Sequence, residues 1–309
     1  MKHVLKLFLS HFLISFLIFS QANAKEFNAS FKLSIGAKGD GPGQFNSPKS
    51  VSSDANGNVY VLDSGNNRIQ KFTPTGQLLT FIGGFGWEQG QFQLPVDIFV
   101  YNSLDIFVAD YENNRIERYD KDLNWLASYY SNRNWNPRYQ FYFPTAVCLS
   151  LHGDFFIADS ENDRIIKLNA SFEPELSFGD YDWGQGVLQE PSDIFITNQD
   201  MVYITDSKAA TVMLYDYFGN FIREIGTEYL SNPQGIYVDE IGHVFVADSD
   251  QHAVFVFDRV GTLVLQIGSF GNKYGAFNEP YDVSVSRDLL FVADTGNHRI
   301  QVFQLQWQE

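Results

Sequence analysis

Three aspartates, each placed two residues after a proline, have the clearest capacity for chemistry in this chain. They are Asp97, Asp193 and Asp282. Carboxylates brought close together repel one another unless they are solvated, protonated or bridged by a cation. Ca²⁺ suits such a group of hard oxygen ligands, completed by water and backbone carbonyls. We therefore expect a Ca²⁺ site where the three meet. The alternative is that these carboxylates bind water or backbone N–H groups.

The prolines before these aspartates belong to a repeat that occurs six times, at steps of 42 to 49 residues. Each copy starts at a proline and reaches, 14 or 15 residues later, an aspartate that ends an apolar run. The prolines are Pro48, Pro95, Pro144, Pro191, Pro233 and Pro280, and the aspartates are Asp63, Asp110, Asp159, Asp206, Asp248 and Asp294. Repeats of this period, with about four short strands each, are typical of a β-propeller. The sequence therefore predicts an all-β, six-bladed β-propeller.

The repeat places the three candidate aspartates in alternate blades. The second position after the proline is aspartate in blades two, four and six, whereas blades one, three and five carry Ser50, Ala146 and Gly235. The first strand of a propeller blade lies nearest the axis. We therefore expect the three carboxylates to converge at one mouth of the central channel with three-fold symmetry.

The ends of the repeat array suggest how the ring closes. In the first copy, strands are expected at residues 49–53, 59–62, 68–72 and 78–82. The sixth copy ends after its third strand, at 299–303, and residues 31–36 read like a fourth strand. We expect the N-terminal strand to complete the sixth blade, because this pairs two edges that would otherwise be exposed.

Charge and cysteine content exclude two possibilities. The 309 residues carry a formal net charge of −16. Because nucleic-acid binding depends on neutralising phosphates, we expect no nucleic-acid partner. The only cysteine, Cys148, excludes an intrachain disulfide, and its apolar neighbours predict a buried side chain rather than a reactive thiol.

The N-terminal residues read as a separate segment. Lys2 and Lys6 precede an apolar stretch at 7–19, and the sequence Ala22-Asn23-Ala24 has the small residues of a cleavage site. We expect residues 1–24 to be a secretory signal and 25–309 to be one propeller domain. The mature chain would be exported, either periplasmic or secreted, and monomeric, without stable membrane insertion. The alternative is an uncleaved anchor, although the apolar stretch is shorter than the ~20 residues that span a bilayer.

The motifs of the repeat resemble those of the NHL-repeat family, in which a proline and an apolar strand precede V-x-D and then N-x-R-I. The resemblance covers about residues 31–303 and is specific in copies one, two, three and six, whereas copies four and five lack the arginine. It implies a six-bladed propeller but no single activity, because members include binding platforms and lyases. In the amidating lyases of this family, an aspartate after the matching proline helps to bind a channel calcium.

Those lyases also hold a catalytic zinc with histidines placed directly after such prolines. The corresponding residues in this chain are Lys49, Val96, Thr145, Ser192, Gln234 and Tyr281. Because none is a histidine and zinc needs three or four convergent ligands, we expect no zinc site of the amidating-lyase type. The sequence assigns no set of catalytic residues.

The aspartates that end the apolar runs recur in every copy, which favours a structural role. At the end of a strand, such a side chain can accept hydrogen bonds from the loop that follows. Four arginines lie five residues after these aspartates and are expected to pair with carboxylates or carbonyls between blades: Arg68, Arg115, Arg164 and Arg299.

The loops that join the blades carry large aromatic side chains. Four of them are predicted to form an exposed ligand-binding rim: Trp87, Trp135, Trp183 and Tyr274. Phenylalanines in a G-Q-F pattern, such as Phe45 and Phe92, are interpreted as filling grooves between blades. The favoured function is non-catalytic binding of a protein, peptide or glycan through the loop-rich face. The alternative is a metal-dependent lyase or hydrolase that works at the channel mouth.

Overall fold

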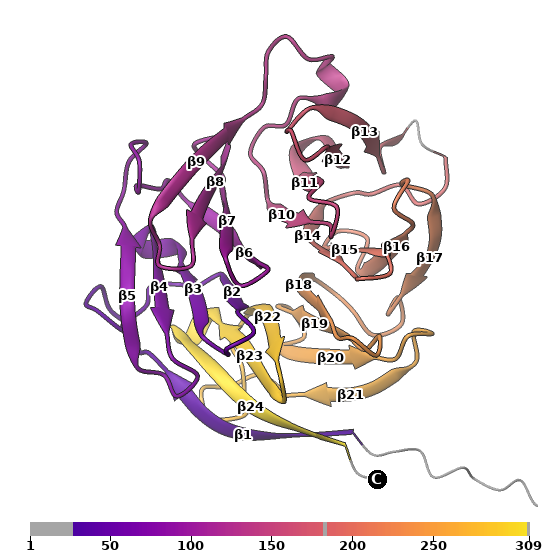
Figure 1. Ribbon diagram of the computed structural model, residues 1–309. Helices are drawn as coiled ribbons and strands as arrows, with labels where there is room; N and C mark the ends of the chain where they lie inside the picture. Colours follow the sequence, from indigo (N-terminus) through magenta and orange to yellow (C-terminus); the bar gives the residue numbers. More distant parts are fainter. Residues whose placement is uncertain (1–26, 182–183, 308–309) are drawn as a thin grey trace, which may run out of the picture.

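The computed structural model describes residues 27–181 and 184–307, which form six four-stranded antiparallel sheets arranged around a central axis (Figure 1). Each sheet is one blade, and its strands are called a to d from the axis outward. This architecture confirms the predicted six-bladed, all-β propeller. The predicted signal segment, residues 1–24, lies outside the described residues.

The blades follow one another along the chain. Blade one contains β2 (Ser50–Ser53), β3 (Val59–Asp63), β4 (Arg68–Phe72) and β5 (Leu78–Gly83), and blade two contains β6 (Pro95–Tyr101), β7 (Asp105–Asp110), β8 (Arg115–Asp120) and β9 (Trp125–Tyr130). Blade three contains β10 (Ala146–Leu149), β11 (Phe155–Asp159), β12 (Arg164–Leu168) and β13 (Pro174–Phe178). Blade four contains β14 (Pro191–Ile196), β15 (Val202–Asp206), β16 (Thr211–Tyr215) and β17 (Phe221–Ile225). Blade five contains β18 (Pro233–Val238), β19 (Val244–Asp248), β20 (Ala253–Phe257) and β21 (Leu263–Ile267).

The sixth blade joins the two ends of the chain. It contains β22 (Pro280–Ser286), β23 (Leu289–Asp294) and β24 (Arg299–Trp307), and its outer strand is β1 (Phe27–Ile35). Strands β1 and β24 pair antiparallel from Phe27 opposite Trp307 to Ile35 opposite Ile300. The expected closure by an N-terminal strand is therefore present, and this strand begins four residues earlier than the sequence indicated.

Hydrophobic side chains fill the grooves between neighbouring blades. Phe45, Phe92 and Phe277 come from loops that join blades, and all three are fully buried. The ring of Phe45 packs against Phe72 with centroids 5.6 Å apart. Gly36 makes room for this ring: its φ is +81°, and a β-carbon there would lie 2.2 Å from the Phe45 ring. The interpretation of the pattern phenylalanines as groove fillers is thus correct.

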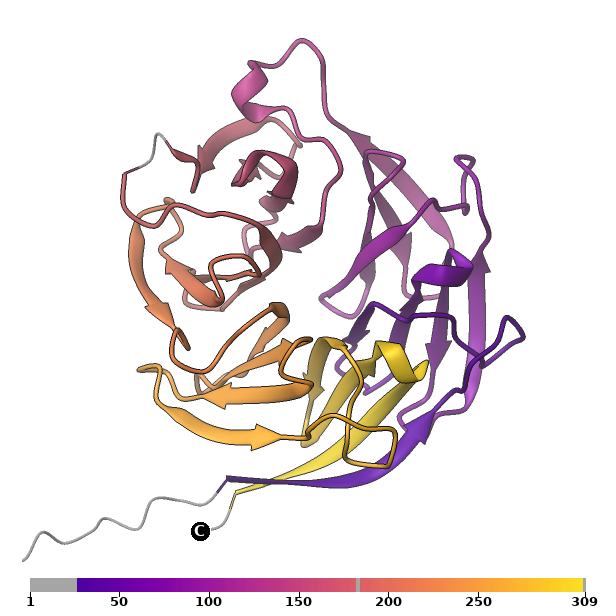
Figure 2. The ribbon, with the colours of Figure 1, turned by 180° about the vertical axis from the view of Figure 1, so that it is seen from behind.

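The two faces of the propeller differ. One face carries the loops that join strand d to the next strand a, together with the 3₁₀ turns that follow strand b, such as η1 (Ser64–Asn66) and η5 (Thr295–Asn297); we call it the loop-rich face (Figure 2). The opposite face, which we call the turn face, carries the short turns between strands a and b and between strands c and d. No helix in the described ranges is long and apolar enough to cross a membrane.

Candidate functional site: the central channel

Asp97, Asp193 and Asp282 divide the central channel into two cavities, and each of these aspartates lines both. The cavity on the loop-rich face has a volume of about 280 Å³ and includes Tyr111 and Glu190 from loops; we call it the mouth cavity. The cavity on the turn face has a volume of about 240 Å³ and is bounded by the a–b turns; we call it the channel well. The three aspartates therefore meet on the axis, as we expected from the sequence, but they lie between two cavities rather than at one mouth of the channel.

Each of these carboxylates is held by the first strand of the next blade. Asp282 Oδ2 accepts the backbone N–H of Val51 at 2.8 Å. Asp97 Oδ2 accepts that of Val147 at 3.0 Å, and Asp193 Oδ2 accepts that of Ile236 at 2.8 Å. An aspartate in each even blade is thus hydrogen-bonded to the backbone of the following odd blade.

The small residues of the odd blades make this arrangement possible. A β-carbon on Gly235 would lie 2.1 Å from Asp282 Oδ1, so only glycine fits there. Ser50 instead supplies a polar atom: its Oγ lies 2.7 Å from Asp282 Oδ2 and 3.1 Å from Asp97 Oδ1. The alternation of aspartate and small residues seen in the sequence therefore has a steric reason.

The electrostatics of the three carboxyl groups favour the protonated form. Burial raises the pKa of Asp97 to about 6. Burial, together with the charge of Asp97, raises the pKa of Asp282 to about 8. The pKa of Asp193 is raised well above its usual value by burial and by both neighbouring carboxylates. None of the ion pairs among the described residues involves these three side chains.

The fit of a metal ion can be judged from the same contacts. Within residues 27–181 and 184–307, no group of three or more His, Cys, Asp or Glu side chains is arranged to hold a metal ion. The oxygens that would have to coordinate Ca²⁺ already accept N–H or O–H groups, as on Asp193, where Ile194 and Ile236 each donate to one oxygen. An ionised carboxylate has about four lone-pair sites, so these hydrogen bonds do not occupy all of them, and the calcium site stays a prediction.

The mouth cavity is lined by all six residues that directly follow the repeat prolines: Lys49, Val96, Thr145, Ser192, Gln234 and Tyr281. The Lys49 ammonium lies 4.8 Å from the centre of the Tyr281 ring, and burial lowers the pKa of Lys49. Tyr111, on the same wall, donates its hydroxyl to Glu161 at 3.1 Å. The described residues that line this cavity include no histidine and no cysteine. The aromatic, amide and charged groups of the mouth cavity are able to bind a polar ligand.

The predicted aromatic rim is only partly assembled. Trp87 and Tyr274 are 74% and 68% exposed, and Tyr274 stacks on Phe31 at 4.6 Å. Trp135 instead packs against Phe172 at 5.9 Å and is half-buried. Trp183 lies outside the described residues. The structure does not bring the three described rim residues into either channel cavity.

The aspartates that end strands b are structural. All six are fully buried. Asp63 accepts hydrogen bonds from Arg68 Nε at 2.7 Å, from Asn66 Nδ2 at 2.8 Å and from the Asn46 backbone at 2.7 Å. Arg68 also donates to backbone carbonyls of the loop that enters the blade, which includes Gln44. The arginines therefore pair with carboxylates and carbonyls as predicted, but the carboxylate belongs to the same blade and only the carbonyls come from the loop between blades.

Blades four and five do without the arginine. Asp206 accepts the backbone N–H of Ala209 at 2.8 Å and that of Gln189 at 2.6 Å. Asp248 accepts the backbone N–H of Gln251 at 3.0 Å and of Ser231 at 2.6 Å. Backbone donors from the same two loops therefore replace the missing guanidinium, which explains how the repeat survives these departures.

Sequence comparison identifies the class. The model of the NHL repeat matches residues 45–72, 230–257 and 277–303, which fall in blades one, five and six. With six four-stranded blades around one axis, the chain is a six-bladed β-propeller that contains NHL repeats. The match in blade five includes a copy that lacks the arginine, so that departure does not remove it from the family pattern. No curated protein matches the sequence.

Solved structures with the same fold come from proteins of different activity. A protein of unknown function from Bacteroides thetaiotaomicron VPI-5482 is 15% identical, with a TM-score of 0.69, and the match covers 91% of this chain and 77% of that one. A gluconolactonase from Xanthomonas campestris is 12% identical, with a TM-score of 0.64 and coverage of 90% and 98%. Virginiamycin B lyase from Staphylococcus aureus is 13% identical, with a TM-score of 0.60 and coverage of 91% and 100%. At these identities the likeness establishes the fold alone.

Proposed function

We propose that this protein is a non-catalytic binding platform that takes a protein, peptide or glycan ligand on its loop-rich face. The observation that carries the proposal is the mouth cavity, whose walls offer the Tyr281 ring, the Gln234 amide and the Glu190 carboxylate. A concave site with an aromatic face and a few polar groups is typical of ligand recognition.

Exposed aromatic side chains on the same face support this proposal. Phe85 and Trp87 project from the loop between β5 and β6, and Phe270 and Tyr274 from the loop between β21 and β22; all four are more than two-thirds exposed. Large aromatic side chains bury much surface at little entropic cost when a partner docks. A ligand anchored in the mouth cavity would extend over one or both of these loops.

A binding screen tests this proposal. Purified protein is presented to a glycan panel and to a random peptide library, and the best ligand is then titrated against Tyr281→Ala and Trp87→Ala. We expect at least one substitution to weaken binding by about tenfold or more, as anchoring aromatics do. The matched control is Leu126→Ala, which removes an exposed apolar side chain on the outer strand β9. Equal affinity in all variants would contradict the proposal.

A metal-dependent lyase or hydrolase is the alternative, and the specific observation in its favour is that Asp97, Asp193 and Asp282 share the floor of the mouth cavity. If a Ca²⁺ ion were bound there, these carboxylates would hold it, and it would supply charge stabilisation to a ligand oxygen. An assay with lactones and amidation precursors, with and without Ca²⁺, tests this. Ca²⁺-dependent turnover that is lost in Asp282→Asn would establish the alternative.

We also propose that the chain is exported and monomeric. The support is the sequence pattern of residues 1–24. Mass spectrometry of the exported protein is expected to give an N-terminus at Lys25. An intact Met1 in a membrane fraction would contradict this and favour the anchor.

A further inference from the structure

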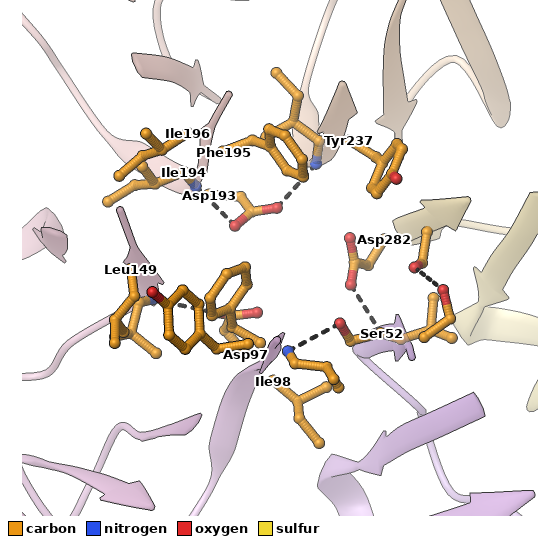
Figure 3. A pocket seen from close by; sticks show the side chains of 18 of the residues that line it. Ser52, Asp97, Ile98, Leu149, Asp193, Ile194, Phe195, Ile196, Tyr237 and Asp282 are labelled. Atoms are coloured by element: carbon orange, nitrogen blue, oxygen red, sulfur yellow. Dashed lines mark hydrogen bonds between the residues drawn. The ribbon is translucent and has the colours of Figure 1, made fainter. Parts of the chain in front are cut away.

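The channel well, on the face opposite the loops, has apolar walls. It is lined by side chains of the six first strands, among them Phe99, Leu149, Phe195, Ile196 and Tyr237 (Figure 3). Phe99, Phe195 and Tyr237 are only partly buried, although each lies against the hydrophobic core of a blade interface. The rings of Phe195 and Tyr237 meet edge to face, with centroids 4.9 Å apart. Aromatic surface left open in a concave site of about 240 Å³ is the kind of surface that small ligands cover.

The floor of the well has the opposite character. The carboxyl groups of Asp193 and Asp282 point toward the central space in Figure 3, and Asp97 completes the floor. Their hydrogen-bond partners in the structure are backbone N–H groups and the Ser50 hydroxyl, all of them neutral donors. The floor therefore offers three acidic groups without a cationic partner among the described residues.

These two properties together select one class of ligand. An anion would be repelled by the floor, and a purely apolar molecule would leave the carboxyl groups without a counter-charge. An inorganic cation would leave the aromatic walls uncovered. A primary ammonium joined to an aromatic or branched apolar body satisfies both, because the ammonium can donate to the carboxylates and the body can pack on the rings.

We propose that the channel well is a binding site for a small organic cation, with its ammonium at Asp97, Asp193 and Asp282 and its apolar body between Phe99, Phe195 and Tyr237. This site is separate from the mouth cavity and the loops to which we assign the main ligand. The two can fail independently, because they lie on opposite faces and use different side chains apart from the shared aspartates.

Proton linkage gives the proposal a distinctive signature. Burial and mutual repulsion raise the pKa of the floor carboxyls. A bound ammonium favours their ionised form and lowers that pKa, so binding must release protons near neutral pH. Affinity for an amine that stays charged is therefore expected to increase several-fold between pH 5.5 and pH 8. A neutral ligand would not show this release of protons on binding.

The test compares three probes of one shape by calorimetry: phenethylamine, 2-phenylethanol and 3-phenylpropionate. The amine is expected to bind at least ~10-fold more tightly than the alcohol, and the carboxylate not at all. Titrations in two buffers of different ionisation enthalpy measure the protons released. Equal binding of amine and alcohol, or no amine binding at millimolar concentration, would overturn the proposal.

Two variants and a control locate the site. Asp193→Asn and Phe195→Ala are each expected to weaken phenethylamine binding about tenfold or more, the first by removing charge and the second by removing a wall. Because Asp193 also holds the Ile236 backbone, Phe195→Ala keeps the test valid if the first variant does not fold. Leu126→Ala, on the outer strand β9 and outside both cavities, serves as the control and is expected to bind the amine normally. Unchanged affinity in a folded Phe195→Ala variant would contradict the assigned site.

Discussion

Two sets of buried aspartates occupy this propeller, and they are satisfied in different ways. The six at the ends of strands b are buried near the loop-rich face, and four of them pair with an arginine. The three in the channel accept only neutral donors, which come from their own strands and from neighbouring strands. Burial raises the pKa of Asp63 as well, but there asparagine and arginine partners lower it again. In the channel no cation does so, and the pKa of Asp282 reaches about 8.

The difference separates architecture from a candidate site. A buried carboxylate that has an arginine, an amide and backbone donors contributes to the fold, as in blades one, two, three and six. A buried carboxyl that lacks a counter-ion is costly in its charged form and is retained where a proton or a ligand completes it. By this criterion the axis of the propeller, rather than the repeat motif, is where a ligand is expected.

The largest effect on stability is expected from removing an arginine that pairs with one of the aspartates at the ends of strands b. Arg115→Met removes the cation that lies 2.9 Å from Asp110 and 2.7 Å from Glu117, both fully buried. Two carboxylates would remain buried without a cation, which costs about 3–5 kcal/mol of unfolding free energy. Urea denaturation measures the loss. The control is Arg118→Met, whose pair with Asp105 is partly exposed and is worth about 1 kcal/mol or less. Similar losses in the two variants would show that the buried pairs are not special.

A second prediction concerns the pH dependence that the channel set imposes. Because folding raises these pKa values, the stabilisation is fully present below the unfolded value of about 3.9 and is lost as pH rises through the folded values. The folded values are about 6 for Asp97 and about 8 for Asp282. Stability is thus expected to fall between pH 5 and pH 8, by on the order of 1 kcal/mol per pH unit for each carboxyl still protonated. In Asp282→Asn the unfolding free energy is expected to fall less steeply with pH. An unchanged dependence on pH would show that Asp282 is not its source.

A third prediction asks whether a metal ion can supply the missing counter-charge. If Ca²⁺ binds at Asp97, Asp193 and Asp282, the melting temperature rises with free Ca²⁺. The free energy of unfolding increases by about 2.7 kcal/mol when free Ca²⁺ is a hundred times the dissociation constant. Asp193→Asn together with Asp282→Asn is expected to abolish the response while keeping the fold. Wild-type protein whose melting temperature does not respond to Ca²⁺ would contradict the calcium site.

The smallest effect on stability is expected from a neutral hydrogen-bond acceptor that belongs to neither set of aspartates. His298 Nδ1 accepts the backbone N–H of Ser47 at 3.0 Å, as the amide oxygen of Asn67 does for Leu94 in the next blade interface. Burial lowers the pKa of His298, so its contribution is present above the unfolded value of about 6.5 and is lost as pH falls. His298→Asn is expected to retain the contact and remove about 0.5 kcal/mol or less of acid sensitivity between pH 7 and pH 5. Thermal melts at the two pH values measure it, and a larger change would indicate a second role for this side chain.

Much of the fold could be predicted because the repeated residues have well-understood structural roles. Proline marks the start of strand a, and the aspartate at the end of strand b is fixed by its loop contacts. Closure by β1 could be predicted because the last copy lacks a strand and edges must be paired. The fate of Trp135 could not, because its burial depends on Phe172, which lies in the c–d turn of the following blade.

The candidate site was only half visible in the sequence. The register of Asp97, Asp193 and Asp282 could be read from their distance to proline, but their donors come from other blades. The aromatic walls were missed although the signal was present. In a strand, residues two apart share a face, and Phe99 and Phe195 each lie two residues after a channel aspartate. Applying that period from the aspartates onward would have found the channel well.

The protonation state of the channel aspartates is the most direct measure of the difference between the two sets. Carbon-13 NMR of protein labelled at the aspartate carboxyl carbons, assigned with Asp97→Asn, Asp193→Asn and Asp282→Asn, follows each group from pH 4 to pH 9. We predict that Asp282 is still protonated at pH 6 and that Asp193 ionises at a higher pH than an ordinary aspartate, because burial and mutual repulsion raise their pKa values without a cation to oppose them. Complete ionisation of all three by pH 5 would contradict this and would mean that the channel carboxylates are as well compensated as those of the blades.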